Sequence, residues 1–596
     1  MAEPDHTLDL IVVGAGVYGT SASGTSYLYT NIWLVCAANT YLQLHPTADV
    51  VVLDSDEDAG GVWSNSRLYP QFWSQTGERL GGYPDSAFKV PEGAEKYHDL
   101  FQAKHLTKYL EDYVTGQAYN GRSLRKRFVF RCWVNNLRKD GDVWNIQANL
   151  EGKNVTYRAG KVIVATGLTS VPNMPQLPGK EHFRGSVLHQ KTFGNSKILT
   201  PEETDAEKHT HITILGGSKS ASDMAYAAAT DTDAPRKVSW IIRTSGSGPL
   251  ILTKAQGFGK YRSLPELGSI RAIANLSSAN PYLPETWFSS FLHKTWLGEW
   301  LLQKIWSQSE TDSAALANYD GRKGALPGFE KLRTETSIRW RSGSVGILQK
   351  DDFWDVVARN VRVYRGDVAG LTEDAVVLGD GTEIRTDVLL CATGWKQQHS
   401  CFSAEEAARL GLPLELNDGR ELVEQSQQRW SKLEEEADRK VLNRWPYLAN
   451  APKFKARPVQ ITPYRLYNLT LPVSDQSIAF LGLQLVPNSY HTALAQTLYA
   501  IAGLDGALKL PPKEEMEKEV AFIDRWCARR YPVHGHVGNV LDYEMVSFTD
   551  YLLKQLGLSS HRTKASWWAD MTDPVVASDY AALVDEYRKK YTDYVS

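Results

Sequence analysis

Short apolar runs that end at a glycine recur in this chain and predict buried parallel strands. Leu8–Val13 ends at Gly14, and His211–Leu215 ends at Gly216. Strands covered on both faces of a sheet are apolar along most of their length. A helix is expected after each glycine turn, and such strand–turn–helix units are typical of an α/β fold. Two units on one chain predict two nucleotide-binding domains, and hence two cofactors between which electrons pass.

The first turn has the residue pattern of a dinucleotide site. Gly14, Gly16 and Gly19 follow the spacing G-x-G-x-x-G. The first glycine permits a tight turn, the second lets a pyrophosphate approach the backbone, and the third allows close packing of helix on strand. Free N–H groups at the start of the helix bind phosphate oxygens. Asp54 comes directly after the second apolar run, 49–53, and is placed to accept hydrogen bonds from ribose hydroxyls.

The length of this first unit departs from the usual pattern. The ribose-binding acid normally lies about 20 residues after the first glycine, whereas Asp54 is 40 residues beyond Gly14. The surplus corresponds to residues 20–37, and its beginning, 20–26, is rich in Gly, Ser and Thr, which are poor helix formers. We therefore expect a protruding loop or an extra helix, with the regular helix resuming near Ala37.

The second turn has a degenerate version of the same pattern. Gly216, Ser218 and Ala221 hold the three glycine positions, and Ser and Ala are small enough for phosphate approach and helix packing. The next predicted strand ends in Arg243 instead of an acid. An arginine there suits the 2′-phosphate of NADPH, although it could also be an ordinary surface arginine. The cofactor-binding set predicted for this unit is Gly216, Ser218, Lys219, Ser220, Asp223, Arg243 and Thr244.

Further motifs give the first turn its context. The sequence AGGVW comes after the Asp54 strand, VIVATG and CATGW end two later strands, and FRGSVLHQKTF contains Phe183, Gly185 and His189. Together these motifs resemble the class B flavin-dependent monooxygenases over about residues 8–550. Within that class the chain is most similar to the flavin-containing N-oxygenating branch and its fungal biosynthetic relatives.

The resemblance implies two Rossmann-like domains with helical additions. A discontinuous FAD-binding domain would span 1–204 and 386–596, and an NADPH-binding domain would span 205–385, with an aromatic-rich helical insert at about 256–342. His189 would hold the linker between the domains and take no part in proton transfer. The flavin site implied by the resemblance comprises Gly14, Gly16, Gly19, Asp54, Gly61, Val62, Trp63, Gln75, Thr76, Thr393, Gly394 and Gly482, with the helix that carries Gln496 covering the flavin.

The resemblance also implies the chemistry. FAD, NADPH and O2 would insert one oxygen atom into a small, apolar biosynthetic substrate through a flavin C4a-hydroperoxide, by N- or S-oxygenation or hydroxylation. The N-oxygenating branch has an asparagine near the flavin, and Ser74-Gln75-Thr76 stands where it is expected. We therefore predict Gln75 and Thr76 as catalytic residues, each supplying hydrogen bonds.

Three alternatives can be weighed on residues. A flavin disulfide reductase would need a cysteine pair beside Gly61, and none is there. A Baeyer–Villiger monooxygenase stays open, because Asp352 is kept, but Phe353 and Trp354 stand where a Tyr-Tyr pair is typical and Phe193-Gly194 stands where Trp-Pro is typical. A catalytically silent nucleotide-binding protein, disrupted after Gly19, is the third alternative.

Composition adds limits. The 596 residues carry a net charge of −3, with a pI near 6.6, which gives no electrostatic case for nucleic acid. Five scattered cysteines indicate a reducing compartment and no metal site. With no signal peptide expected, we predict a cytoplasmic protein.

An aromatic stripe at 288–300 allows three interpretations. Phe288, Leu292, Trp296 and Trp300 recur at intervals of four and fall on one face of a predicted helix. Packing on the protein body is the plainest interpretation. A wall or lid of the substrate pocket and contact with a membrane surface are the alternatives.

Overall fold

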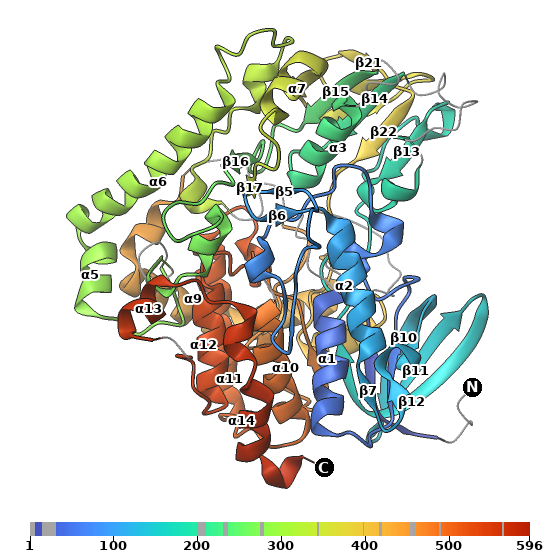
Figure 1. The fold of residues 1–596 in the computed structure, drawn as a ribbon, viewed down its shortest axis with the longest axis vertical. Helices are drawn as coiled ribbons and strands as arrows, with labels where there is room; N and C mark the ends of the chain where they lie inside the picture. The colour runs from blue at the N-terminus through green and yellow to red at the C-terminus, as the bar shows by residue number, and fades with distance from the viewer. Residues whose placement is uncertain are drawn as a thin grey trace.

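Two sheets with parallel cores organise the chain (Figure 1). The computed structural model describes residues 6–14, 31–196, 198–199, 210–230, 236–273, 279–341, 345–396, 399–416, 420–452, 455, 459–487, 490–562 and 565–595. The first sheet has the order β10-β11-β12-β1-β2-β9, and β25 also pairs with β12. Its strands are β1 (Leu8–Val13), β2 (Val50–Leu53), β9 (Phe128–Val129), β10 (Cys132–Asp140), β11 (Val143–Leu150), β12 (Lys153–Val164) and β25 (Ile478–Phe480).

The second sheet is parallel throughout, in the order β13-β22-β14-β15-β18. Its strands are β13 (Ser186–His189), β14 (His211–Leu215), β15 (Lys237–Ile242), β18 (Val361–Arg365) and β22 (Val388–Cys391). Thus β13 and β22, which flank the segment 205–385, both join the sheet built from that segment. The carboxyl ends of parallel strands meet at one edge, where nucleotide sites form.

Helices pack around both sheets, and in Figure 1 many of them lie at the lower left and centre, beside strands β10, β11 and β12 at the lower right. The helices used below are α1 (Asn31–Leu44), α2 (Ala103–Gly116), α3 (Lys219–Thr230), α5 (Trp287–Lys294), α6 (Trp296–Ala317), α7 (Phe353–Asn360), α8 (Ala404–Leu410), α9 (Arg420–Arg444), α10 (Tyr490–Leu504), α11 (Lys513–Arg530), α12 (Met545–Gln555), α13 (Trp567–Thr572) and α14 (Leu583–Lys590). Every residue of α10 is buried, and α10 packs between α1 and α12. The largest hydrophobic core lies there, between the first sheet and these helices.

The expectation that the first helix resumes near Ala37 is wrong. Helix α1 already begins at Asn31, and Ile32, Trp33, Leu34, Val35 and Cys36 are buried in its first two turns. Helix α1 packs against α10, so the regular helix includes part of the segment for which a protruding loop or an extra helix was expected. Residues 15–30, including Gly16, Gly19 and the stretch 20–26, lie outside the described residues.

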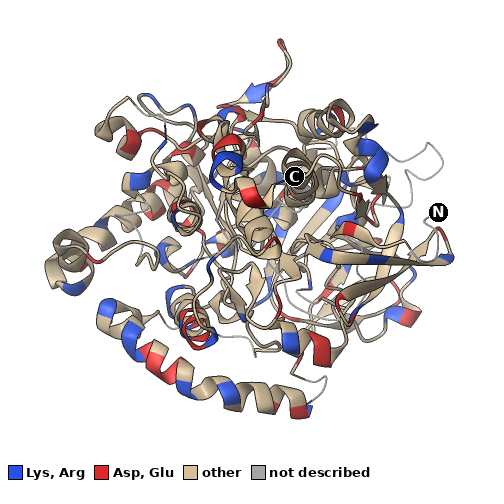
Figure 2. Ribbon diagram, turned by 90° about the horizontal axis from the view of Figure 1, so that it is seen from below, with Lys and Arg blue, Asp and Glu red and all other residues tan. Residues whose placement is uncertain are grey.

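The predicted insert lies between two short strands. Strands β16 (Ile251–Thr253) and β17 (Val345–Ile347) pair in parallel, and the chain between them carries α5 and α6 along one edge of the molecule (Figure 1). In the part of the chain that is described, no helix combines the length and the apolar character needed to span a bilayer. Acidic and basic side chains are interspersed in the view of Figure 2.

Candidate active site

The end of β1 brings the first glycine and the predicted acid together. Gly14 N donates to Leu53 O at 2.7 Å, and a Cβ on Gly14 would lie 2.7 Å from Asp54 Oδ2. Asp54 is fully buried, and its Oδ1 accepts a hydrogen bond from Asp56 N at 3.0 Å. Desolvation by burial, and after it the negative charge of Asp56, raises the pKa of Asp54 to about 7. A buried carboxyl beside this glycine fits the adenosine ribose of FAD.

The first turn of α1 has bulky residues near the same glycine. A Cβ on Gly14 would lie 3.0 Å from Leu34 Cδ2. Gly482 has φ +71°, and a Cβ there would lie 2.7 Å from Trp33 Cδ1, so the indole is packed against the Gly482 backbone. Trp33 therefore covers one side of Gly482, the residue predicted to contact the flavin. Trp33 was itself expected to belong to the surplus segment 20–37.

The segment predicted to lie beside the flavin ring is buried and leaves polar groups unpaired. A short 3-10 helix spans Gly61–Trp63, with φ +56° at Gly61. Trp63 stacks on Phe72 with ring centroids 5.3 Å apart. Among the described residues, the buried Trp63 Nε1 and Ser55 Oγ have no hydrogen-bond partner. Because buried polar groups are normally paired, these two atoms fit a bound polar cofactor.

At the second turn, glycine is required and the helix begins directly after it. Gly216 has φ +145°, and a Cβ there would lie 2.3 Å from Ala392 O. Trp240 Nε1 donates to Gly216 O at 2.6 Å, which fixes the turn on β15. Helix α3 begins at Lys219, and the buried Ser218 hydroxyl before it has no partner among the described residues. A free hydroxyl at a helix N-terminus fits a phosphate group.

Lys219 and Asp223 point into the protein. Lys219 Nζ donates to Gln349 Oε1 at 2.7 Å and forms an ion pair with Asp223. Tyr69 OH donates to Asp223 Oδ2 at 3.4 Å. Desolvation by burial lowers the pKa of Lys219. The predicted phosphate-binding lysine is thus part of an interior network, while Ser220 lines a small pocket with Val62.

Basic residues from three segments meet at the end of β15. A Cβ on Gly246 would lie 3.4 Å from Arg243 Nη2, and a Cβ on Gly248 would lie 3.1 Å from Arg365 Nη1. Lys455 Nζ donates to Thr244 Oγ1 at 3.1 Å. Arg243 and Thr244 were expected here from the sequence, whereas Arg365 and Lys455 were not. Arg365 could have been predicted for this site, because it is the last residue of strand β18. No sequence feature near Lys455 predicted its position.

Gln75 and Thr76 lie at the junction of the two nucleotide-binding units. Ile347 N donates to Gln75 Oε1 at 2.8 Å, and Gln75 Nε2 donates to Ile347 O at 3.4 Å. Gln349 Nε2 donates to the backbone oxygens of Trp73 and Ser74, both at 2.9 Å. The amide of Gln75 is therefore committed to strand β17, and Gln75 holds that strand in place.

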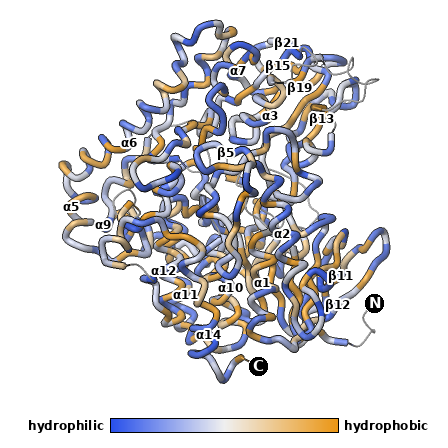
Figure 3. The backbone as a smooth tube through the Cα atoms, viewed as in Figure 1, coloured by the Kyte–Doolittle hydropathy of each residue, from blue (hydrophilic) through white to orange (hydrophobic). Residues whose placement is uncertain are grey.

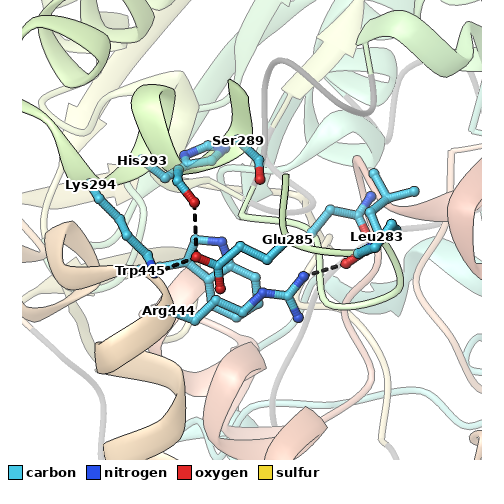
Figure 4. Close-up of a pocket in the computed structure, with 10 residues that line it drawn as sticks. Leu283, Glu285, Ser289, His293, Lys294, Arg444 and Trp445 are labelled. Carbon is cyan, nitrogen blue, oxygen red and sulfur yellow. Dashed lines mark hydrogen bonds and ion pairs between the residues drawn. The ribbon is translucent and has the colours of Figure 1, made fainter. Parts of the chain in front are cut away.

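A cavity of about 310 Å³ opens at this junction. Its lining includes the polar side chains of Gln75, Thr76 and Lys219. Most of the other lining residues are apolar, among them Leu264, Leu267, Ile273, Trp306, Ile338 and Ile347. By contrast, the pocket beside α5 in Figure 4 holds only about 20 Å³, roughly the space of one water molecule. The 310 Å³ cavity, called the Gln75 cavity below, is the candidate substrate site.

The linker motifs meet where the chain crosses between the sheets. His189 Nε2 donates to Gly394 O at 2.8 Å, and His189 Nδ1 accepts from Lys191 N at 3.2 Å. Thr393 Oγ1 donates to Asn173 O at 2.5 Å. Burial lowers the pKa of His189 to about 4, so the ring is neutral near pH 7. His189 fastens the linker, as expected, and Thr393 and Gly394 serve the same crossing.

Comparisons with known proteins give the family. A family model described as L-lysine 6-monooxygenase/L-ornithine 5-monooxygenase matches residues 99–254. An FAD-dependent monooxygenase of Pyrenophora dematioidea is 30% identical over 593 residues, covering 93% of this chain and 99% of that protein. This chain belongs to the FAD-dependent monooxygenases. Another member, resA of Aspergillus sclerotiorum, is 29% identical over 97% of this chain and 98% of its own length.

The fold of this FAD-dependent monooxygenase agrees with solved class B enzymes. The open crystal structure of cyclohexanone monooxygenase matches with a TM-score of 0.57 and 15% identity, covering 93% of this chain and 97% of that one. The α/β prediction with Rossmann-like units is confirmed. FAD is the cofactor of the family, and the buried polar atoms near Trp63 and the acid at Asp54 fit it.

Proposed function

We propose that this FAD-dependent monooxygenase uses NADPH and O2 to insert one oxygen atom into a small, apolar biosynthetic substrate bound in the Gln75 cavity. The observation that carries the proposal is the cavity itself, which is lined both by Gln75 and Thr76, predicted to lie near the flavin, and by Lys219, predicted to lie near the nicotinamide nucleotide. Its mostly apolar walls suit an apolar substrate. The FAD-dependent monooxygenase DEP4 of Alternaria brassicicola, 28% identical over 98% of this chain, supports the monooxygenase part of the proposal.

When bound, FAD would accept hydride from NADPH and activate O2. The chain's part is to bind, orient and keep the site dry. Asp54 would accept hydrogen bonds from ribose hydroxyls, and Trp63 would bound the ring system on one side. Ser218 would bind the pyrophosphate of NADPH, and the basic cluster of Arg243, Arg365 and Lys455 would bind its 2′-phosphate.

In this proposal Gln75 is a positioning residue that holds strand β17 in place. Because its amide pairs with both backbone groups of Ile347, it fixes β17, which forms a wall of the cavity. Thr76 is buried in the same wall. A wall that does not move excludes water. Exclusion of water limits the unproductive loss of activated oxygen as hydrogen peroxide.

The test is NADPH oxidation by the flavin-loaded protein across panels of amines, sulfides and ketones, with product and peroxide measured together. We expect oxygenated product from amines or sulfides, with little peroxide. Esters or lactones from ketones would instead establish the Baeyer–Villiger alternative. Peroxide in proportion to NADPH with every substrate class would contradict the proposed cavity.

A further inference from the structure

Helices α5 and α6 lie at one edge of the molecule (Figures 1 and 3) and carry several exposed large apolar side chains. Trp287 and Trp296 are 82% and 81% exposed, and Ile305 is 61% exposed. We call the indole face the set Trp287, Phe288, Trp296, Leu297, Trp300, Leu301 and Ile305, all exposed. Scattered exposed apolar residues are ordinary, but a contiguous run on two successive helices indicates an interaction surface.

The two helices are held firmly with this face outward. Thr286 and Ser289 form a capping box at the start of α5, and Thr295 Oγ1 accepts from Gly298 N at the start of α6. A Cβ on Gly298 would lie 2.2 Å from Phe291 O, so the two helices are in close backbone contact. The small residues of α6, such as Gly298 and Ala317, face the protein. The outward direction of the aromatic residues is therefore built into the packing.

The charges on this segment are sorted by face. Over residues 286–308 the charged side chains are Lys294, Glu299 and Lys304. Glu299 turns inward, where Arg339 Nη1 and Nη2 donate to its carboxylate at 2.6 and 3.0 Å. Lys304 is exposed, with its Nζ 5.8 Å from the centroid of the Trp300 ring. Lys304 thus adds a positive charge beside the aromatic rings of the indole face. The Glu299 carboxylate of the same helix is neutralised by Arg339.

The base of α5 is tied to the body beside this face (Figure 4). Ser290 Oγ donates to Glu285 Oε1 at 2.8 Å, and Lys294 pairs with the same carboxylate. Arg444, at the end of α9, bonds the backbone oxygen of Leu283. Glu285 is therefore compensated by Lys294, and Lys304 leaves the indole face with a positive charge.

We propose that the indole face docks on the surface of a phospholipid bilayer that contains anionic lipids. Indole rings have an apolar body and a polar N–H, and they favour the boundary between headgroups and acyl chains. A lysine among them is attracted to anionic headgroups. A protein partner would be expected to offer carboxylates to Lys304 and pockets to the rings, and a second copy of this chain would bring a second Lys304 toward the first.

The position of α6 connects this surface with the active site. Trp306 and Ser309 of α6 line the Gln75 cavity, while Leu301 and Ile305 of the same helix belong to the indole face. A bilayer-bound enzyme would place this cavity next to a reservoir of apolar substrate. This last step rests on the proposed function, whereas the docking does not, and the two are tested separately.

The docking test is flotation of the full flavin-loaded chain with vesicles of phosphatidylcholine alone and of phosphatidylcholine mixed with phosphatidylserine. We expect binding to the mixed vesicles that weakens with salt. Trp287→Ser/Trp296→Ser should reduce the partition coefficient by at least about tenfold, because two indoles leave the membrane interface. These side chains are almost fully exposed, so the fold should be retained. Lys304→Glu should weaken binding to the mixed vesicles only.

The matched control is Val459→Ser/Tyr594→Ser, which removes an exposed aliphatic and an exposed aromatic side chain elsewhere. It should bind like the parent protein. Equal loss in the control, equal binding of the tryptophan variant, or a dimer in solution that the tryptophan variant abolishes would each overturn the proposal. Flotation does not depend on turnover, so an inactive protein that floats leaves the docking standing and counts only against the proposed function.

Discussion

The two strand–turn–helix units differ in the residues that come after their first glycine. After β14, helix α3 begins at Lys219, next to the Gly216–Ser218 turn, and Ala221, Ser222 and Ala225 are small and buried. After β1, the next described residues are those of α1, Asn31–Leu44, and its first turn holds bulky apolar residues. Phosphate contact requires backbone close to the ligand, and only small residues allow that.

In the described part of the first unit, the strand and the acid are both in place. Gly14 and Asp54 lie together as in an intact first unit. Trp33, however, is packed on Gly482, near the predicted flavin contact. The second unit has its nucleotide-binding elements within the described residues. The first depends on Gly16 and Gly19, which lie outside them.

The largest expected effect is on the second turn. Gly216→Val places a branched side chain at φ +145° and within 2.3 Å of Ala392 O. We expect loss of measurable NADP⁺ binding and a loss of roughly 2–6 kcal/mol in the free energy of unfolding, from strain and overpacking. Titration calorimetry and urea unfolding measure both quantities. Gly160→Val, at a strand position with open space, is the control, and equal loss there would remove the special role of Gly216.

The next effect tests whether Trp33 belongs to the core. Trp33→Ala should cost about 3–5 kcal/mol in the free energy of unfolding, because a fully buried indole leaves a cavity between α1 and Gly482. Trp568→Ala, on α13 and exposed, should change it by less than about 0.5 kcal/mol. Urea unfolding of both variants is the measurement. If Trp33→Ala were as mild as its control, residues 31–36 would be a dispensable addition after all.

A smaller effect is expected at the nucleotide-selecting end of β15. Arg243→Ala should raise the KM for NADPH by more than about tenfold and leave the KM for NADH nearly unchanged, because a charge-assisted contact contributes about 1.5–3 kcal/mol. Lys237→Ala, at the opposite end of the same strand, is the control. Steady-state kinetics with both nucleotides decides. Similar changes for NADPH and NADH would place the 2′-phosphate elsewhere.

The last effect, which changes with pH, concerns the acid of the first unit. Burial raises the pKa of Asp54 from 3.8 to about 7, so the folded chain holds a proton that the unfolded chain has released. The stability contributed by Asp54 is thus full below pH 3.8 and is lost as the pH rises through about 7, by at most about 1.4 kcal/mol per pH unit. Asp54→Asn should remove this slope from urea unfolding in the cofactor-free protein. An unchanged slope would mean that the carboxyl is already ionised when folded.

Much of this arrangement could be predicted from local sequence. Apolar runs before Gly14 and Gly216 predicted β1 and β14, and Asp54 was expected directly after the second strand. The role of His189 in holding the linker was also expected, and its bond to Gly394 confirms it. These features depend on residues close in sequence or on motifs with fixed spacing.

Other features could not be predicted, because their partners lie far along the chain. The amide of Gln75 was expected to act in catalysis, but it pairs with Ile347, 272 residues away. Lys219 was expected to bind phosphate, but Asp223 and Gln349 hold it in the interior. Arg365 and Lys455 were missed, since only folding brings them to the loop after Arg243.

By itself the sequence determined the buried parallel strands β1 and β14, the glycines that follow them and the class of cofactor, because strand burial and turn geometry depend on short runs of residues. The tertiary structure decided the place of Ile32–Cys36, which are helical and buried, with α1 packed against α10. It also decided which polar groups remain for ligands. A side chain's chemistry is local, but its availability depends on partners that only the fold brings within hydrogen-bond distance.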